Sequence, residues 1–146
     1  TNLRIGEEIL LPQDLLYLYG YPLNGMYDDV FTLESQVIEV RDKPSYPVGE
    51  LGVDAFGHKP VYIDKGIRRK VLLAMGHLDY CDYKDLIPQD KDVEILGCSS
   101  DHTIMDVTDA PRTYHVGDIV KFNLIYGTNL FLCHSQNVQK VFIDEE

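Results

Sequence analysis

The chain has 146 residues, of which 45% are apolar and 25% are charged, and these values indicate a globular domain with a core of its own. The formal net charge of −11 argues against nucleic acids and anionic membranes as partners, because both attract clusters of lysine and arginine. No stretch reaches the roughly 18 apolar residues of a membrane span. The acidity favours solubility, and attraction of cationic substrates is the alternative.

The cysteines and histidines give no metal motif. Cys81, Cys98 and Cys133 are widely spaced, and no C-x-x-C, H-x-H or H-x-x-x-H pair occurs, so we expect no metal site. Reduced thiols and the absence of a visible secretory signal indicate a cytoplasmic protein. The chain begins at Thr1 and continues at once with a strand-like segment, which suggests the interior of a longer protein.

The first twenty residues read as a strand followed by a helix. Leu3–Leu11 has the apolar character of a buried strand and stops before Pro12. Pro12–Tyr19 is expected to be helical, with proline in the first turn and Gly20 just past the end. Tyr21–Asp29 contains Pro, Asn, Gly and Asp and is expected to be a connector.

The rest of the chain shows short apolar runs bounded by turn residues, which is typical of an all-β domain. We expect about six to eight strands in a compact barrel or sandwich. The expected strands are Phe31–Val40, Pro60–Ile63, Arg68–Met75, Val93–Cys98, Thr103–Thr108, Ile119–Ile125 and Val138–Ile143. Turns or loops are expected over Arg41–Tyr46, Val48–Gly57, Tyr80–Asp92 and Val116–Asp118.

Four segments could carry chemistry, and each also has a purely structural interpretation. Leu3–Glu7 is either a ligand-binding strand end or an ordinary buried one. Gly76–Tyr80 offers groups able to move protons, or forms a turn with a surface histidine. Gly97–His102 offers polar groups to a carboxylate or phosphate, or forms a tight turn held by serine and aspartate. Pro47–Gly57, with three glycines, lines a pocket or a subunit boundary, or is a plain surface loop.

At these places the chain resembles the alanine racemase-like, fold-type III family of pyridoxal 5'-phosphate (PLP) enzymes, and most closely its ornithine and alanine/ornithine racemases. The blocks Gly49–Gly57 and Ile95–His102 carry the specific part of the resemblance. The weaker matching blocks are Leu3–Glu7, Asp29–Leu33, Val116–Asp118 and Val138–Phe142, so that nearly the whole chain is covered.

The family fold is a TIM-like barrel that carries PLP, followed by a β-rich C-terminal domain. The resemblance implies that residues 1–20 are the last barrel strand and the following helix of a truncated barrel, and that residues 21–146 are the C-terminal β domain. The expected fold class is therefore mainly β: a compact barrel- or sandwich-like domain preceded by the last strand of a TIM-like barrel. The apolar run of Leu3–Leu11 suits a parallel barrel strand buried on both faces.

The resemblance also implies cofactor-binding residues at the start of the chain. Arg4 matches the family's arginine at the PLP pyridine nitrogen, and a guanidinium that stays protonated keeps that nitrogen unprotonated. Gly6 and Glu7 match positions where backbone N–H groups meet the phosphate. The lysine that forms the Schiff base belongs to the first barrel strand, and no lysine of this chain lies in a matching context.

A second acid/base is implied in the Gly76–Tyr80 segment. The family's catalytic tyrosine lies in a Gly-Tyr-Ala-Asp-Gly sequence, and His77 takes the place of that tyrosine here, while Asp79 matches the aspartate. We therefore expect the proton-transferring group at His77, with Asp79 and Tyr80 as the alternatives.

Substrate contacts are implied in the Ser99–Asp101 segment. It matches a Cys-Met-Asp sequence that holds the substrate carboxylate, which implies Ser100 and Asp101 as substrate-binding residues. A family tyrosine that bonds the phosphate is replaced here around Gln136.

The resemblance as a whole implies an isomerase, an amino-acid racemase of the alanine, ornithine or lysine type. In the homodimer of the longer parent protein, this domain would close the partner subunit's active site around a small amino-acid substrate and supply the second acid/base. The fragment alone is expected to be inactive, because it lacks the barrel lysine. The alternative is a non-catalytic β domain that dimerises or binds a ligand.

Overall fold

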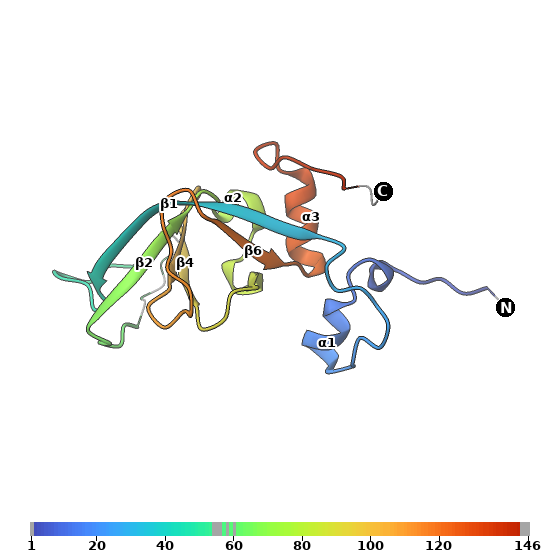
Figure 1. The fold of residues 1–146 in the computed structure, drawn as a ribbon, viewed down its shortest axis with the longest axis horizontal. Helices are drawn as coiled ribbons and strands as arrows, with labels where there is room; N and C mark the ends of the chain where they lie inside the picture. The colour runs from blue at the N-terminus through green and yellow to red at the C-terminus, as the bar shows by residue number, and fades with distance from the viewer. Residues whose placement is uncertain (1, 54–56, 58, 60, 144–146) are drawn as a thin grey trace.

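A computed structural model describes residues 2–53, 57, 59 and 61–143 of the chain. Its centre is a six-stranded antiparallel sheet in the order β3-β6-β1-β2-β5-β4, and the sheet curls into half of a barrel (Figure 1). The prediction of a mainly β domain is confirmed. Among the described residues, no helix is long and apolar enough to cross a membrane.

Strand β1 (Thr32–Pro44) joins the two halves of the sheet. Its first residues pair with β6 (Ile119–Asn123), and its second half pairs with β2 (Ile67–Leu73). The register shifts between Val37 and Glu39, at the point where the partner strand changes. A bulge bends a strand and increases its twist, so this irregularity lies where the sheet must curl.

The remaining strands extend the sheet on both sides. Strand β5 (Thr103–Asp106) pairs with β2 and with β4 (Glu94–Cys98), while the two-residue strand β3 (Ile87–Pro88) borders β6. Proline cannot donate a ladder hydrogen bond, so Pro88 suits an edge strand.

The core lies on the concave face of the sheet, because apolar and polar side chains alternate along the strands. In β1, Leu33, Ser35 and Val37 are buried, and the residues between them are exposed. Two helices complete this core, since α2 (His77–Tyr80) contributes Tyr80 and α3 (Tyr126–His134) contributes Leu132.

The N-terminal segment differs from the expectation. The predicted helix is confirmed as α1 (Gln13–Tyr19), which ends at Gly20 with φ 69°. The strand expected over Leu3–Leu11 does not form: residues 2–6 have no regular structure, and Glu7–Ile9 is a 3₁₀ helix (η1). A barrel strand is hydrogen-bonded to neighbours on both sides, and no described strand lies beside this segment, which extends away from the sheet in Figure 1.

Three further boundaries are corrected. The turn expected over Arg41–Tyr46 begins later, because residues up to Pro44 pair with β2 in a long hairpin. Residues 61–63 form no strand, and Pro60 lies outside the described residues. The segment Tyr80–Asp92 is not simply a surface loop, since it contains a buried tyrosine, a 3₁₀ helix (η2, Tyr83–Asp85) and strand β3.

The C-terminal region is also corrected. Residues 138–143 form no strand, and helix α3 lies before them in a stretch for which the sequence predicted no element. Only Thr128 and Leu132 of α3 are buried, one helical turn apart. Two buried residues give no repeating apolar pattern along the helix, so the sequence shows no helical periodicity here.

The glycine-rich loop behaves as expected where it is described. Gly49 and Gly57 both have positive φ, at 112° and 84°. A residue without a side chain adopts this conformation without steric cost. Asp54–Phe56, in the middle of the same block, lie outside the described residues.

Two adjacent residues of β5 test which side of the sheet faces the core. Met105 has no exposed surface, whereas Ile104, next to it, is 40% exposed. We expect Met105→Ala to lower the free energy of unfolding by about 2–5 kcal/mol, since it leaves a cavity, and Ile104→Ala to lower it by less than about 1 kcal/mol. Urea unfolding of both variants checks this, and equal losses would contradict the assignment.

Candidate functional site

Two of the segments singled out from the sequence lie against each other. The N–H of His77 donates to the carbonyl oxygen of Ser99 at 2.9 Å, and the N–H of Leu78 donates to that of Ser100 at 3.1 Å. The segment that begins at Gly76 is therefore bonded to the turn between β4 and β5. The structure brings the predicted acid/base and the predicted substrate-binding residues onto one rigid unit.

Gly76 makes this contact possible. A Cβ atom at this position would lie 2.3 Å from the carbonyl oxygen of Ser100 and 2.4 Å from the backbone nitrogen of Asp101. Backbone atoms cannot move aside as a flexible side chain does, so any larger residue forces the two segments apart. Glycine is required here by close approach and not by positive φ, since its φ is −147°.

The turn between β4 and β5 is held by its own first residue. The N–H of Ser99 donates to the carbonyl oxygen of His102 at 2.8 Å, and the N–H of His102 donates to Ser99 Oγ at 3.1 Å. The tight-turn interpretation of this segment is confirmed. Ser100 and Asp101 project from the turn with exposed side chains, and their contact with a substrate stays a prediction.

Asp79 is built into the structure below this contact. Its side chain is buried, and Oδ2 accepts a hydrogen bond from the N–H of Gly76 at 3.0 Å. The other carboxylate oxygen, Oδ1, accepts a hydrogen bond from Ser135 Oγ at 3.1 Å. One oxygen binds the backbone of Gly76 and the other binds the hydroxyl of Ser135, which favours a structural role over proton transfer to a substrate.

Tyr80 is likewise locked in the core, with 1% of its surface exposed. Its hydroxyl lies 2.6 Å from Thr103 Oγ1, which donates to the carbonyl oxygen of Met75 at 2.8 Å. Because the threonine hydroxyl has a single proton, the tyrosine must be the donor in the first of these bonds. Burial raises the pKa of Tyr80 well above its usual value. These contacts also favour a structural role.

His77 is the predicted acid/base with access to solvent, because its side chain is only half-buried. It stands at the first position of α2, directly after the glycine contact. A neutral imidazole carries one nitrogen that donates a proton and one that accepts a proton, which suits a group that transfers protons. Of His77, Asp79 and Tyr80, the histidine is the group that the geometry favours for chemistry.

The backbone leaves α2 through a strained residue. Cys81 has φ 75° and ψ −69°, and the N–H of Asp82 donates to the carbonyl oxygen of Tyr80 at 3.1 Å, which closes a three-residue γ-turn. A side-chain-bearing residue in this conformation persists only where its surroundings hold it. The contacts of Asp79 and Tyr80 are the ones that do so.

The predicted cofactor residues are not brought to this place. Arg4, Gly6 and Glu7 are exposed on the N-terminal segment, which Figure 1 shows extending away from α2. Gly6 and Glu7 form the start of η1, where N–H groups are not used within the helix. Their role as cofactor ligands therefore stays a prediction about a longer protein.

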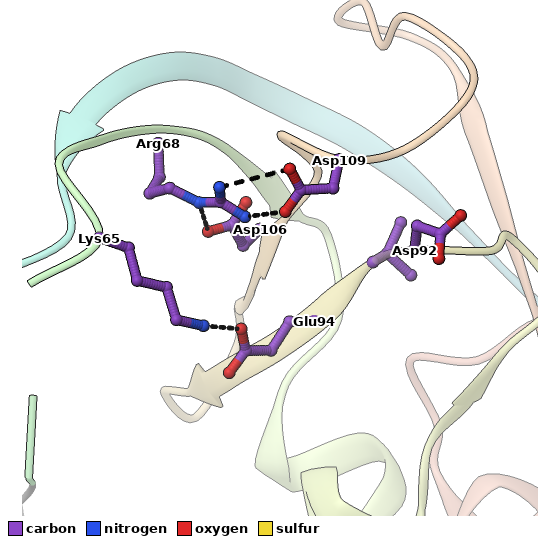
Figure 2. Close-up of a pocket in the computed structure, with 7 residues that line it drawn as sticks. Lys65, Arg68, Asp92, Glu94, Asp106 and Asp109 are labelled. Atoms are coloured by element: carbon purple, nitrogen blue, oxygen red, sulfur yellow. Dashed lines mark hydrogen bonds and ion pairs between the residues drawn. The ribbon is translucent and has the colours of Figure 1, made fainter. Parts of the chain in front are cut away.

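A shallow hollow of about 380 Å³ lies elsewhere, over β2, β4 and β5 (Figure 2). Its cations are already paired: Arg68 binds Asp106 at 2.8 Å and also Asp109, and Lys65 binds Glu94 at 2.7 Å. The hollow thus holds a surface ion-pair network, which the sequence did not indicate. Among the described residues, no group of three or more His, Cys, Asp and Glu side chains is placed to hold a metal ion.

Comparison with known proteins relates the chain to racemases, although no family model matches it. It is 49% identical over 140 residues to an ornithine racemase of Acetoanaerobium sticklandii and 41% identical over 142 residues to a lysine racemase of Thermotoga maritima. The chain belongs to this racemase family. These matches cover 96% and 97% of the chain but only 39% of each relative, so the chain spans about two fifths of the length of these relatives.

The resemblance predicted from the sequence is thereby confirmed. Among solved structures, the alanine racemases of Acinetobacter baumannii and Bartonella henselae align with 73% of this chain and with 33% and 30% of their own chains. The TM-score is 0.43 in both cases, with 15% and 19% identity.

A substitution at Gly76 tests its contact with the backbone of Ser100. We expect Gly76→Ala to lower the free energy of unfolding by about 3 kcal/mol, because the added methyl group collides with backbone. Gly127→Ala is the matched control, since a Cβ at Gly127 meets no atom within 4 Å and should change stability by less than about 1 kcal/mol. Equal stability of the two variants in urea unfolding would contradict the close approach.

The pairing of Asp106 predicts a dependence of stability on pH. Burial raises the pKa of its carboxyl, but hydrogen bonds from Arg68 and Thr108 outweigh this and hold the pKa below its usual value. A carboxyl with a lowered folded-state pKa stabilises the fold above about pH 4, and this contribution disappears as the pH falls through the folded-state pKa.

We therefore expect Asp106→Asn to lower the melting temperature at pH 7 and to flatten its decline between pH 4 and pH 2. Asp109→Asn is the control, because its side chain pairs with the same arginine from an exposed position. Thermal unfolding across this pH range checks both variants. An unchanged acid dependence in Asp106→Asn would rule out the assignment.

Proposed function

We propose that the chain is the C-terminal domain of a PLP-dependent amino-acid racemase that acts on ornithine, lysine or a related small amino acid. The support is the 49% identity to an ornithine racemase over 96% of the chain, together with the lysine racemase relative. On this proposal, residues 1–20 belong to the end of the barrel and residues 21–146 form the C-terminal β domain.

The observation that carries the proposed mechanism is the backbone contact between His77 and the Ser99–Asp101 turn. His77 would exchange a proton with one face of the substrate α-carbon. The hydroxyl of Ser100 can donate a hydrogen bond to the substrate carboxylate. The carboxylate of Asp101 can bind an ammonium group of the substrate. Because the turn and the histidine share hydrogen bonds, they would hold the substrate and the proton-transfer group in one fixed relation.

The described residues fit part of the cofactor. The exposed guanidinium of Arg4 and the N–H groups at the start of η1, beside Gly6 and Glu7, suit the pyridine nitrogen and the phosphate of PLP. PLP, when bound, supplies an electron sink for the substrate α-carbon. Every described lysine is exposed or half-buried, and Lys65 and Lys121 are paired with glutamates. We therefore place the Schiff-base lysine in the part of the racemase outside this chain.

Exposed apolar side chains support assembly into something larger. Leu3 is 77% exposed, and Leu18, Tyr19 and Tyr21 are similarly open around α1. Several large apolar side chains exposed in this way are typical of an interaction surface. We propose that it packs against the barrel and that the parent forms a homodimer, in which this domain closes the partner subunit's active site.

Two further parts of the proposal concern the fragment itself. It should be inactive alone, because a racemase of this kind needs the barrel lysine. We also propose a cytoplasmic location, since Cys81, Cys98 and Cys133 are all unpaired thiols.

The test uses the full-length racemase that contains this chain, with L-ornithine and L-lysine as substrates and chiral chromatography as the readout. We expect His77→Gln to lower kcat by about 10²–10⁴-fold, the range usual for loss of a general acid/base. His115→Gln is the control, because this histidine is exposed on the connection between β5 and β6.

Racemisation that survives unchanged in His77→Gln would move the proton-transfer role to another residue. Absence of both a PLP absorbance band and racemisation in the unmodified parent would overturn the proposed function. That result would favour the non-catalytic β domain instead.

A further inference from the structure

Ser135, which follows helix α3, makes a hydrogen bond across the domain to the segment that carries His77. Its hydroxyl donates to Asp79 Oδ1 at 3.1 Å, although the two residues are 56 positions apart in the sequence. The opposite oxygen of the same carboxylate, Oδ2, accepts the N–H of Gly76 at 3.0 Å. Serine, aspartate and glycine therefore form a chain of hydrogen bonds that ends one residue before His77.

The serine is itself held from several sides. Its N–H donates to the carbonyl oxygen of Phe131 at 2.9 Å, and its Oγ accepts the N–H of Asn137 at 3.2 Å. Its carbonyl oxygen accepts a hydrogen bond from Lys140 Nζ. Because the backbone of Ser135 is fixed in this way, its hydroxyl points in one direction. It therefore selects one orientation of the Asp79 carboxylate.

The far end of the chain is equally confined. Gly76 lies against the backbone of Ser100 with no room for a side chain, and Asp79 is only 8% exposed. Rotation of the Asp79 carboxylate would therefore displace the backbone of Gly76 and His77. Solvent cannot replace the lost hydrogen bond at so buried a group without rearrangement.

We propose that Ser135 is a positioning residue for His77: through Asp79 and Gly76, it sets where the imidazole stands relative to the Ser99–Asp101 turn. The proposal rests on the proposed function, because it assigns His77 to proton transfer. Ser135 touches no reacting atom, and neither the sequence patterns nor the resemblance singled it out. The hydrogen-bond chain is what assigns it this role.

The experiment compares variants of the full-length racemase with L-ornithine and L-lysine. We expect Ser135→Ala to lower kcat by about 10–100-fold with KM changed less than about threefold, because displacement of a catalytic group by a fraction of an ångström slows the chemical step more than it weakens binding. Ser135→Thr keeps the hydroxyl and should restore kcat to within about threefold of the unmodified enzyme.

Ser45→Ala is the matched control. Ser45 Oγ also donates to an aspartate, Asp64 Oδ1, at 3.3 Å, but at an exposed position between β1 and β2. Its loss removes the same type of hydrogen bond away from the proposed site and should leave kcat unchanged.

A second readout is independent of catalysis. Hydrogen exchange followed by mass spectrometry on the peptide that contains Gly76 and His77 should show at least about tenfold faster exchange in Ser135→Ala, with no change in Ser45→Ala. If Ser135→Ala does not fold, Ser135→Cys replaces it, since a thiol of similar shape is a weaker donor. We then expect a smaller but measurable loss of kcat.

The outcomes separate the two proposals. Loss of kcat in His77→Gln with unchanged kcat in Ser135→Ala, or in Ser135→Cys, overturns the positioning role and leaves the proposed function intact. An equal loss in Ser135→Ala and Ser135→Thr also overturns it, because the hydroxyl would then not matter. Unchanged kcat in His77→Gln overturns the assignment of His77 and the positioning role with it.

Discussion

The close approach of Gly76 to the backbone of Ser100 is the constraint on which the rest of the candidate site depends. It lets the first turn of α2 form hydrogen bonds with the turn between β4 and β5, two elements that a side chain would otherwise separate. The half-buried His77 takes its position from this contact. The buried Asp79 and Tyr80 on the same short helix serve the contact by anchoring it to α3 and β5.

The curled sheet supplies the frame for this arrangement. The bulge in β1 lets a single strand pair with β6 at one end and β2 at the other, so both halves of the sheet share one core. Strand β2 then leads directly into Gly76, while β5 supplies Thr103 beneath Tyr80. Strained backbone at Cys81 is tolerated because these contacts hold the segment on both sides.

The start of the N-terminal segment packs differently from the sheet. Its apolar side chains, such as Leu3 and Ile5, face solvent, and its backbone is not paired in a sheet. Both features follow if the segment is completed by other parts of the parent protein. The sheet, by contrast, encloses a core together with α2 and α3, and Leu11 from the end of the N-terminal segment joins this core.

The sequence by itself determined the elements whose evidence is local. Short apolar runs bounded by turn residues identified β1, β2, β4, β5 and β6, proline and glycine bounded α1, and short blocks identified the racemase family. Only the tertiary structure decided that residues up to Pro44 continue β1, that α3 forms, and that Asp79 and Ser135 meet. Each of these features depends on contacts with residues far away in the sequence. The sequence around one residue does not show which distant residue it contacts. The roles of Asp79 and Tyr80 were hidden for the same reason, since burial of a polar group is a property of its surroundings.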